Sequence, residues 1–286
     1  MNRDQEVAPP DLSGNVVLHA NRVEKTYPNG TRALDEVRLT VRRGEFISLL
    51  GPSGCGKSTL LKMFAGLEAP SHGHLRWWGQ NLATVGSAGH TLAMVFQEAT
   101  LMPWASVHDN VRLPLTLRQM PASVSAPRVA AALKLVGLDS FADAYPRELS
   151  GGMQMRASIA RALALQPNLL LMDEPFGALD EFTRNKLDAD LRAIWSAQDL
   201  TVVFVTHSIY EAVFLSSRVI VMAARPGRVI ADIAIDAPGE RDDAFRTSSA
   251  FLGYCKTLSD CLVQANTVNT AKLSNRQGES HDALAL

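Results

Sequence analysis

The sequence predicts an α/β fold with a mainly parallel sheet, because short, continuously apolar runs alternate with helical patterns. A strand covered by helices on both faces has such a run, whereas a strand with one solvent-facing side alternates apolar and polar residues. Helical patterns at residues 182–197 and 210–215 separate the later runs, as parallel strands with crossover helices require. The apolar runs are residues 46–50, 169–172, 201–205 and 218–222.

Strand signals also occur before and after the first apolar run. Residues 16–27 are rich in strand-forming side chains, and Val37, Leu39 and Val41 alternate as a half-buried strand does. Two further segments indicate strands in the same way, residues 75–78 and 91–96.

The segment from about residue 98 to 165 differs in character, because prolines punctuate it and helical patterns such as 128–136 dominate. We interpret it as a helical subdomain inserted into the strand-rich body. Phe251, Cys255, Leu258 and Leu262 follow the body at helical spacing. The expected organisation is a flexible leader (1–14), a main domain (15–240), a C-terminal helical extension (241–265) and a disordered tail (266–286).

The composition narrows the class of protein. The 286 residues carry a formal net charge of −1, so no basic excess indicates a nucleic-acid partner. Three scattered cysteines are too few for a disulfide framework or a metal cluster, which fits a reducing compartment. We find neither a signal peptide in the polar first fifteen residues nor an apolar run of about 18 residues that could span a membrane. We therefore expect a cytoplasmic protein that reaches a membrane only through a partner.

A glycine-rich segment, residues 51–59 with the sequence GPSGCGKST, joins the run 46–50 to a helical pattern. Its glycines let successive backbone N–H groups point at one spot, where the following helix adds the positive end of its dipole. Lys57 can then reach the β- and γ-phosphates of a nucleotide, and the Ser58 hydroxyl can bind the magnesium ion between them. Such a turn can also serve packing alone, but this strand–loop–helix order favours nucleotide binding. The candidate binding residues here are Gly51, Pro52, Ser53, Gly54, Cys55, Gly56, Lys57, Ser58 and Thr59.

Two acidic residues, Asp173 and Glu174, follow the apolar run 169–172. The end of a buried strand can present carboxylates to a ligand without burying them. Asp173 is placed to hold magnesium through water, and Glu174 to polarise an attacking water molecule. Strand ends are often acidic, so the pair alone is weak evidence for a site. The phosphate-binding loop upstream is what favours a catalytic role for these two residues.

Ser150, Gly151 and Gly152 stand directly before the helical pattern 153–164, which makes a second helix start able to bind an anion. The ordinary alternative is a serine N-cap beside a flexible hinge. One nucleotide pocket rarely needs two such starts, so we expect the second to serve a nucleotide held by another copy of the chain.

With these motifs the chain resembles the ATP-binding subunits of ABC transporters, from about residue 16 to 235. The segment LSGGM, residues 149–153, is similar to the signature motif of that family, although Met153 stands where glutamine is common. The resemblance implies a P-loop NTPase core with a mainly parallel sheet, an N-terminal antiparallel β subdomain and an inserted helical subdomain. It also implies an ATPase whose two copies enclose two ATP molecules head to tail.

The remaining family elements occur in order, and their roles are those that the resemblance implies. Tyr27 matches the residue that stacks on adenine, and Gln97 the glutamine that contacts magnesium and senses the transmembrane partner. Asp180 matches the loop that crosses the dimer interface, and His207 the switch histidine on the γ-phosphate. Each of these residues, taken alone, could have a purely structural role. Their occurrence together, in the same order as in the family, is what supports the functional roles. The implied catalytic residues are Lys57, Glu174 and His207; the magnesium ligands are Ser58, Gln97 and Asp173; and the residues contributed by the second chain are Ser150, Gly151, Gly152 and Asp180.

Residues 97–104, 107–111 and 224–228 resemble importers of nitrate, sulfonate, taurine and related small anions. Their ordinary alternatives are a turn with a packed aromatic residue, Trp104, and a simple hairpin at Pro226-Gly227. The resemblance implies transmembrane permease subunits as partners, a periplasmic binding protein acting indirectly, and a peripheral place on the cytoplasmic face of the bacterial inner membrane. The alternatives are an importer ATPase for another small solute, an ABC ATPase not tied to transport, and a nucleotide-binding module without hydrolysis.

Overall fold

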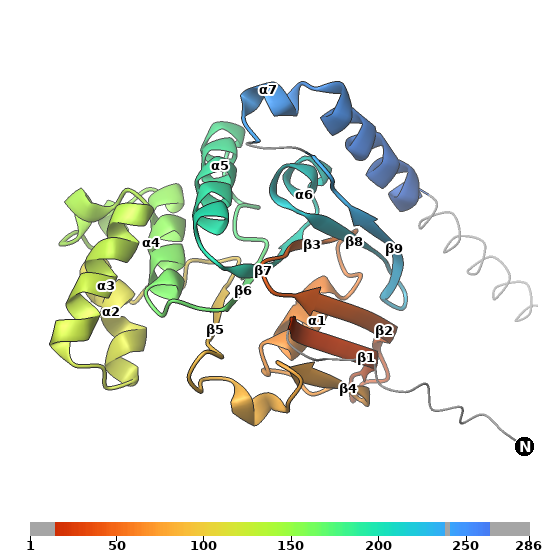
Figure 1. Cartoon of the computed structure of the whole chain (residues 1–286), viewed down its shortest axis with the longest axis horizontal. Coiled ribbons are helices and arrows are strands. Elements are labelled where there is room, and N and C mark those ends of the chain that lie inside the picture. Colours follow the sequence, from red (N-terminus) through yellow and green to blue (C-terminus); the bar gives the residue numbers. More distant parts are fainter. Residues whose placement is uncertain (1–14, 238–240, 264–286) are drawn as a thin grey trace, which may run out of the picture.

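The computed structural model describes residues 15–237 and 241–263 (Figure 1). The expected leader lies outside the described residues, as does the expected tail. Figure 1 shows a central sheet with a small β subdomain below it and a helical subdomain at the left. A helical C-terminal segment runs along the top of the view.

The N-terminal β subdomain is an antiparallel sheet in the order β2-β1-β4. Its strands are β1 (Val16–Thr26), β2 (Arg32–Arg42) and β4 (His72–Trp77), which confirms the three strand signals in this part of the sequence. One face is buried and the other partly exposed, as the alternation in β2 predicts.

The central sheet has the order β5-β6-β7-β3-β8-β9. Neighbouring strands from β5 to β8 are parallel, whereas β9 is antiparallel to β8. The prediction missed β9 as a strand, since its half-exposed, mixed sequence lacks a continuous apolar run; it completes the hairpin that Pro226-Gly227 suggested. The strands are β3 (Phe46–Leu50), β5 (Leu92–Val95), β6 (Leu169–Asp173), β7 (Thr201–Thr206), β8 (Arg218–Ala223) and β9 (Arg228–Ala234).

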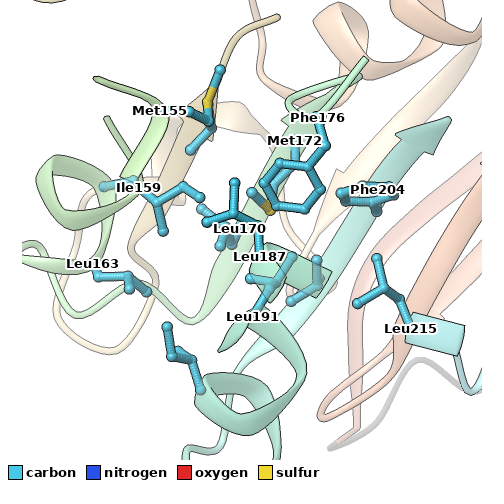
Figure 2. Close-up of a cluster of buried hydrophobic side chains, with 14 of the residues drawn as sticks. Met155, Ile159, Leu163, Leu170, Met172, Phe176, Leu187, Leu191, Phe204 and Leu215 are labelled. Carbon is cyan, nitrogen blue, oxygen red and sulfur yellow. The ribbon is translucent and has the colours of Figure 1, made fainter. Parts of the chain in front are cut away.

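Both faces of the parallel strands are buried, which explains their continuous apolar runs. In β6, Leu169 and Leu171 pack toward the β subdomain and α1 (Lys57–Phe64), whereas Leu170 and Met172 pack toward the helices on the other face. Figure 2 shows this second cluster, in which strand side chains meet residues such as Ile159 and Leu187. The alternation of β3 and β7 between the same two clusters fixes the register of the strand ends that carry the site.

The helical subdomain contains α2 (Val107–Leu117), α3 (Ala122–Leu135) and α4 (Gly151–Leu163), which confirms that helices dominate the segment after β5. Two later helices, α5 (Glu181–Ala197) and α6 (Ile209–Leu215), cover the same face of the central sheet as α4. Their positions agree with the helical patterns in the sequence. Within the described residues, no helix is both long and apolar enough to span a membrane.

The C-terminal segment packs on the core by a buried arginine and two apolar side chains. After α7 (Asp243–Arg246), a helix covers residues 249–263, and it buries Phe251 and Leu258 as its helical spacing predicts. The Arg241 guanidinium donates hydrogen bonds to the carbonyl groups of Val213, Phe214, Ser216 and Ile235.

Candidate nucleotide-binding site

The glycine-rich loop forms a strand-to-helix turn between β3 and α1. Gly54 and Gly56 have φ angles of 74° and 89°, in the left-handed region that glycine adopts without steric cost. Gly56 is also the N-cap of α1 and offers no side-chain hydrogen bond to the first helical N–H groups. These N–H groups need another acceptor, and an anion such as phosphate satisfies both them and the helix dipole.

Lys57 is the first residue of α1 and its side chain is only 4% exposed. Its ammonium donates to the carbonyl oxygens of Gly51 at 2.8 Å and Pro52 at 3.2 Å, and lies 3.6 Å from a carboxylate oxygen of Glu174. These contacts hold the Lys57 ammonium beneath the loop, where it can interact with a phosphate that binds to the loop.

Ser58 and Asp173 meet across the base of the loop. The Ser58 hydroxyl donates to Oδ1 of Asp173 at 2.8 Å, so a hydroxyl and a carboxylate oxygen lie together at the edge of the sheet. Burial raises the pKa of Asp173, and the hydrogen bond from Ser58 partly opposes that rise. A cation at this position would favour the ionised carboxylate.

Glu174 and His207 follow the neighbouring strands β6 and β7. The backbone N–H of Glu174 donates to the carbonyl of Val205, which fixes the end of one strand against the other. Nδ1 of His207 lies 3.2 Å from Oε2 of Glu174, and the histidine side chain is 53% exposed. The carboxylate and the imidazole thus face the same open space beside the phosphate-binding loop.

Tyr27 lies beside the first turn of α1, where its hydroxyl is 3.3 Å from Oγ1 of Thr59. The ammonium of Lys25 is 5.2 Å from the centre of the Tyr27 ring. The half-buried ring is therefore anchored at the rim of the loop, where a base that follows the phosphates outward could contact it.

A groove of about 420 Å³ opens between these elements, and Lys57, Ser58, Thr59 and Glu174 line it. Four other residues line the groove and belong to no nucleotide-binding motif in the sequence: Thr31, Arg32, Ala33 and Arg225. The turn that carries Arg225 packs closely on the loop, since a Cβ atom at Gly227 would lie 2.2 Å from the Cys55 carbonyl oxygen. The N–H of Gly227 also donates to the carbonyl of Ala33 at 3.0 Å. These tertiary contacts join a turn distant in sequence to the site, and the spacing of the motifs does not predict them.

Cys55 is fully buried in the loop, and burial raises the pKa of its thiol. This shift opposes the thiolate that a helix start favours. The side chain instead fills space, because a Cβ atom at Gly51 would lie 2.8 Å from its sulfur atom.

Ser150 is the N-cap of α4, on another part of the surface, and its hydroxyl oxygen accepts a hydrogen bond from the N–H of Met153 at 3.3 Å. Ser150 and Gly151 are exposed, and neither lines the groove around Lys57. They adjoin the start of α5, since a Cβ atom at Gly152 would lie 2.7 Å from the Thr183 side chain. Asp180, the N-cap of α5, is exposed on the same surface.

Gln97 lines a second groove, with a volume of about 510 Å³, rather than the groove around Lys57. This groove separates the segment after β5 from the start of α4, and Gly151, Gln154 and Pro175 are also in its lining. Trp104 is not part of the lining and is 75% exposed. Side-chain contacts therefore link Tyr27, Asp173 and His207 to the loop and to Glu174, although these three residues do not line the groove around Lys57. The other predicted site residues also lie outside that groove: Gln97, Ser150, Gly151, Gly152 and Asp180.

This geometry agrees with the comparisons with known proteins. The family described as ABC transporter matches residues 34–177. The chain is 45% identical to an uncharacterized ABC transporter ATP-binding protein of Methanocaldococcus jannaschii over 92% of this chain and 97% of that protein. It is 42% identical to the aliphatic sulfonates import ATP-binding protein of Bacillus licheniformis, over 80% of this chain and 87% of that protein. It is 47% identical to the taurine import ATP-binding protein of Rhizobium johnstonii, over 73% and 79% of the two chains.

Solved structures give the same result. The dimeric structure of a bacterial ABC transporter cassette superposes with a TM-score of 0.68 at 33% identity, covering 77% of this chain and 100% of that chain. A cassette from Clostridium perfringens, described as part of an ABC transporter complex, gives a TM-score of 0.70 at 28% identity over 82% and 92% of the two chains. The fold and the phosphate-binding loop define an ATP-binding cassette of the P-loop class. The chain belongs to the ABC transporter family, as its sequence motifs predicted.

Proposed function

We propose that this chain is the ATP-hydrolysing subunit of an importer, in which ATP binding and hydrolysis drive uptake of a small anion through membrane permease subunits. The observation that carries the proposal is the contact of Glu174 with both Lys57 and His207 at the phosphate-binding loop. A phosphate-binding module without hydrolysis needs the lysine but has no use for a carboxylate and an imidazole aimed at the same space.

The loop would bind the triphosphate of ATP through its backbone N–H groups and the ammonium of Lys57, while Tyr27 contacts the adenine base. Two carbonyl oxygens already hold the Lys57 ammonium in place, so it could pair with a phosphate oxygen with little rearrangement of its side chain. Arg225 and Arg32 line the same groove. Arg225 adds positive charge near the phosphates, whereas the Arg32 guanidinium is paired with Glu24 and Asp35.

Magnesium fits the oxygen atoms that Ser58 and Asp173 bring together. Within the described residues no three His, Cys, Asp or Glu side chains are arranged to hold a metal, so the other ligands would be phosphate oxygens and water. Gln97 lines the second groove and would join them only by moving toward the ion. The ion would supply charge neutralisation at the β- and γ-phosphates.

In the hydrolysis step, Glu174 would orient a water molecule for in-line attack on the γ-phosphorus and accept its proton. His207 would hold the γ-phosphate and that water in register, and Lys57 would stabilise the charge that develops on the phosphoryl oxygens. Hydrolysis breaks the bond between the γ-phosphorus and the bridging oxygen and yields ADP and phosphate.

The site becomes complete when a second copy docks. Ser150, Gly151 and Asp180 are exposed and lie outside the groove around Lys57, so the helix start of α4 can bind a γ-phosphate held by another chain. The solved cassette that resembles this chain is described as dimeric, which supports this arrangement. ATP would close the dimer, and hydrolysis would release it.

The transported anion belongs to the sulfonate, taurine or nitrate type. Two relatives named above are described as import ATP-binding proteins for aliphatic sulfonates and for taurine, and they match most of this chain. The permease would occupy the groove lined by Gln97, with the exposed Trp104 beside it, on the cytoplasmic face of the bacterial inner membrane. A periplasmic binding protein would act only through the permease.

The test reconstitutes the chain with its permease in vesicles and measures phosphate release and uptake of labelled taurine, an alkanesulfonate and nitrate. Thermal shift of the cognate binding protein identifies the anion beforehand. We expect permease-dependent uptake that needs ATP and fails with Glu174→Gln. Phosphate release that is independent of the permease, without uptake of any anion, would contradict the importer proposal.

A further inference from the structure

The residues on either side of His207 are held by a buried side-chain contact. Thr206 ends β7, and its hydroxyl donates to Oε2 of Glu211 on α6. The same hydroxyl oxygen accepts a hydrogen bond from the N–H of Ser208 at 2.9 Å. Thr206 and Glu211 are 2% and 6% exposed. The backbone that presents the His207 imidazole is therefore fixed by one hydroxyl and one carboxylate.

A second loop is held from the same place. Arg184 lies in the first turn of α5, and its guanidinium donates to the carbonyl oxygens of Leu179 at 2.7 Å and Phe176 at 3.3 Å. These carbonyl groups belong to the loop that runs from Glu174 to Asp180. Arg184 thus holds the segment that leads to the residue expected to contact the second chain.

One carboxylate joins the two loops. Oε1 of Glu211 lies 3.5 Å from Nε of Arg184, while its Oε2 takes the Thr206 hydroxyl. The loops also touch directly, since a Cβ atom at Gly177 would lie 3.8 Å from Cε1 of His207. A displacement of either loop would therefore strain the Arg184–Glu211 contact.

Stability alone does not account for this pair. The pair gains little net free energy over apolar side chains of the same volume, because the Glu211 carboxylate is 7% exposed and loses its hydration, while the Arg184 side chain is 28% exposed and keeps part of its own. Burial raises the pKa of Glu211, and the Thr206 hydrogen bond and the Arg184 charge oppose that rise. Burying the Glu211 carboxylate costs free energy, and the pair that it forms with Arg184 joins the loops of Asp180 and His207. We therefore interpret the pair as a means of positioning these two loops.

We propose that Arg184 and Glu211 are positioning residues that couple the loop carrying Asp180 to the loop carrying His207. When a second copy contacts Asp180, the Arg184–Glu211 pair aligns the His207 imidazole with the γ-phosphate. The inference rests on the proposed ATPase function and adds to it a route by which contact with the second chain reaches the site of hydrolysis.

The test compares Glu211→Gln with the wild type in ATPase kinetics, together with direct ATP binding. Glutamine still accepts the Thr206 hydrogen bond but cannot pair with Arg184. We expect kcat to fall by about tenfold or more while KM and the Kd for ATP stay within about twofold, because Lys57 and the loop are untouched. In the Glu174→Gln background, Glu211→Gln should weaken the ATP-dependent dimer in light scattering.

Three further variants separate positioning from simple loss of structure. Arg184→Met removes the contact with Glu211 and also the two hydrogen bonds to the loop that leads to Asp180, so it should lower kcat at least as much as Glu211→Gln. The double variant should be no worse than Arg184→Met alone, because that variant has already lost the shared contact. Thr206→Ser keeps the hydroxyl and should stay within about twofold of the wild type, whereas Thr206→Val should not. Thermal unfolding midpoints show whether each variant folds.

The matched control is Arg192→Met, since Arg192 lies two turns further along α5 and donates to the Leu215 carbonyl at 2.6 Å without touching either loop. It should retain kcat within about twofold. A folded Glu211→Gln with wild-type kcat and dimerisation would overturn the proposal, as would an equal loss in Arg192→Met. A wild-type chain that hydrolyses no ATP with its permease would instead refute the proposed function itself, so the two failures are distinguishable.

Discussion

Nδ1 of His207 lies 3.2 Å from Oε2 of Glu174, and this contact joins the ends of the neighbouring strands β7 and β6. The other oxygen of the same carboxylate lies 3.6 Å from the ammonium of Lys57. Glu174 therefore bridges the phosphate-binding loop and the histidine in the nucleotide-free chain. A bound triphosphate would compete for Lys57 and His207, which would leave the carboxylate available to a water molecule.

The first prediction concerns Glu174→Gln. The carboxamide keeps the size of the side chain but cannot accept a proton from water, so hydrolysis should fall by about a hundredfold or more while ATP binding persists. With Mg-ATP the variant should accumulate as a dimer. Phosphate release and light scattering measure the two effects, and near-normal hydrolysis with the permease present would remove Glu174 from the role of base.

The second prediction concerns Lys57→Ala. This change removes the charge beneath the loop and leaves the carbonyl groups of Gly51 and Pro52 without their donor. We expect the Kd for Mg-ATP to rise by about tenfold or more, with hydrolysis below detection. Calorimetric titration measures the affinity, and unaltered binding and hydrolysis would refute the assignment of the loop.

The third prediction concerns the thiol of Cys55. Because it is buried and burial raises its pKa, alkylation by a maleimide should be slower than at Cys261, which is half-buried in the C-terminal helix. Mass spectrometry of the modified peptides over time measures both rates. Faster alkylation of Cys55 would show a reactive thiolate in the loop.

The fourth prediction follows from Asp188 on α5, which pairs with Arg246 at 3.3 Å and is 1% exposed. Burial, and then repulsion from Glu211, raises the pKa of Asp188 from 3.8 to about 7. The folded chain therefore holds a proton that the unfolded chain has lost between about pH 4 and pH 7. Within that window the Asp188 contribution to the free energy of unfolding falls as pH rises, by up to about 1.4 kcal/mol per pH unit.

Asp188→Asn removes this titration. The variant should lose less stability than the wild type between pH 4 and pH 7, and denaturant unfolding at several pH values measures the difference. Parallel stability profiles for the two proteins would show that Asp188 has an ordinary pKa.

The sequence predicted the sheet, the helical insertion and the loop because each depends on local patterns. Continuous apolar runs identify strands buried on both faces, and glycines mark the turn that only they can make. β9 and the contribution of Arg225 to the groove were not predicted, because they depend on a turn that packs against Cys55 from a distant part of the chain. The Arg184–Glu211 contact has no motif either, since a charged pair is recognisable only when the fold brings α5 and α6 together.

In the proposed dimer each ATP site is shared between two chains, and a disulfide between cysteines at positions 53 and 150 would report this arrangement. In the background of Glu174→Gln, with Cys55, Cys255 and Cys261 replaced by alanine, one chain carries Ser53→Cys and a differently tagged chain carries Ser150→Cys. After mild oxidation with Mg-ATP, we expect a disulfide between the two tagged chains that does not form with Mg-ADP. A third protein carries both changes in one chain. A disulfide within that chain, with none between the two tagged chains, would contradict the shared site.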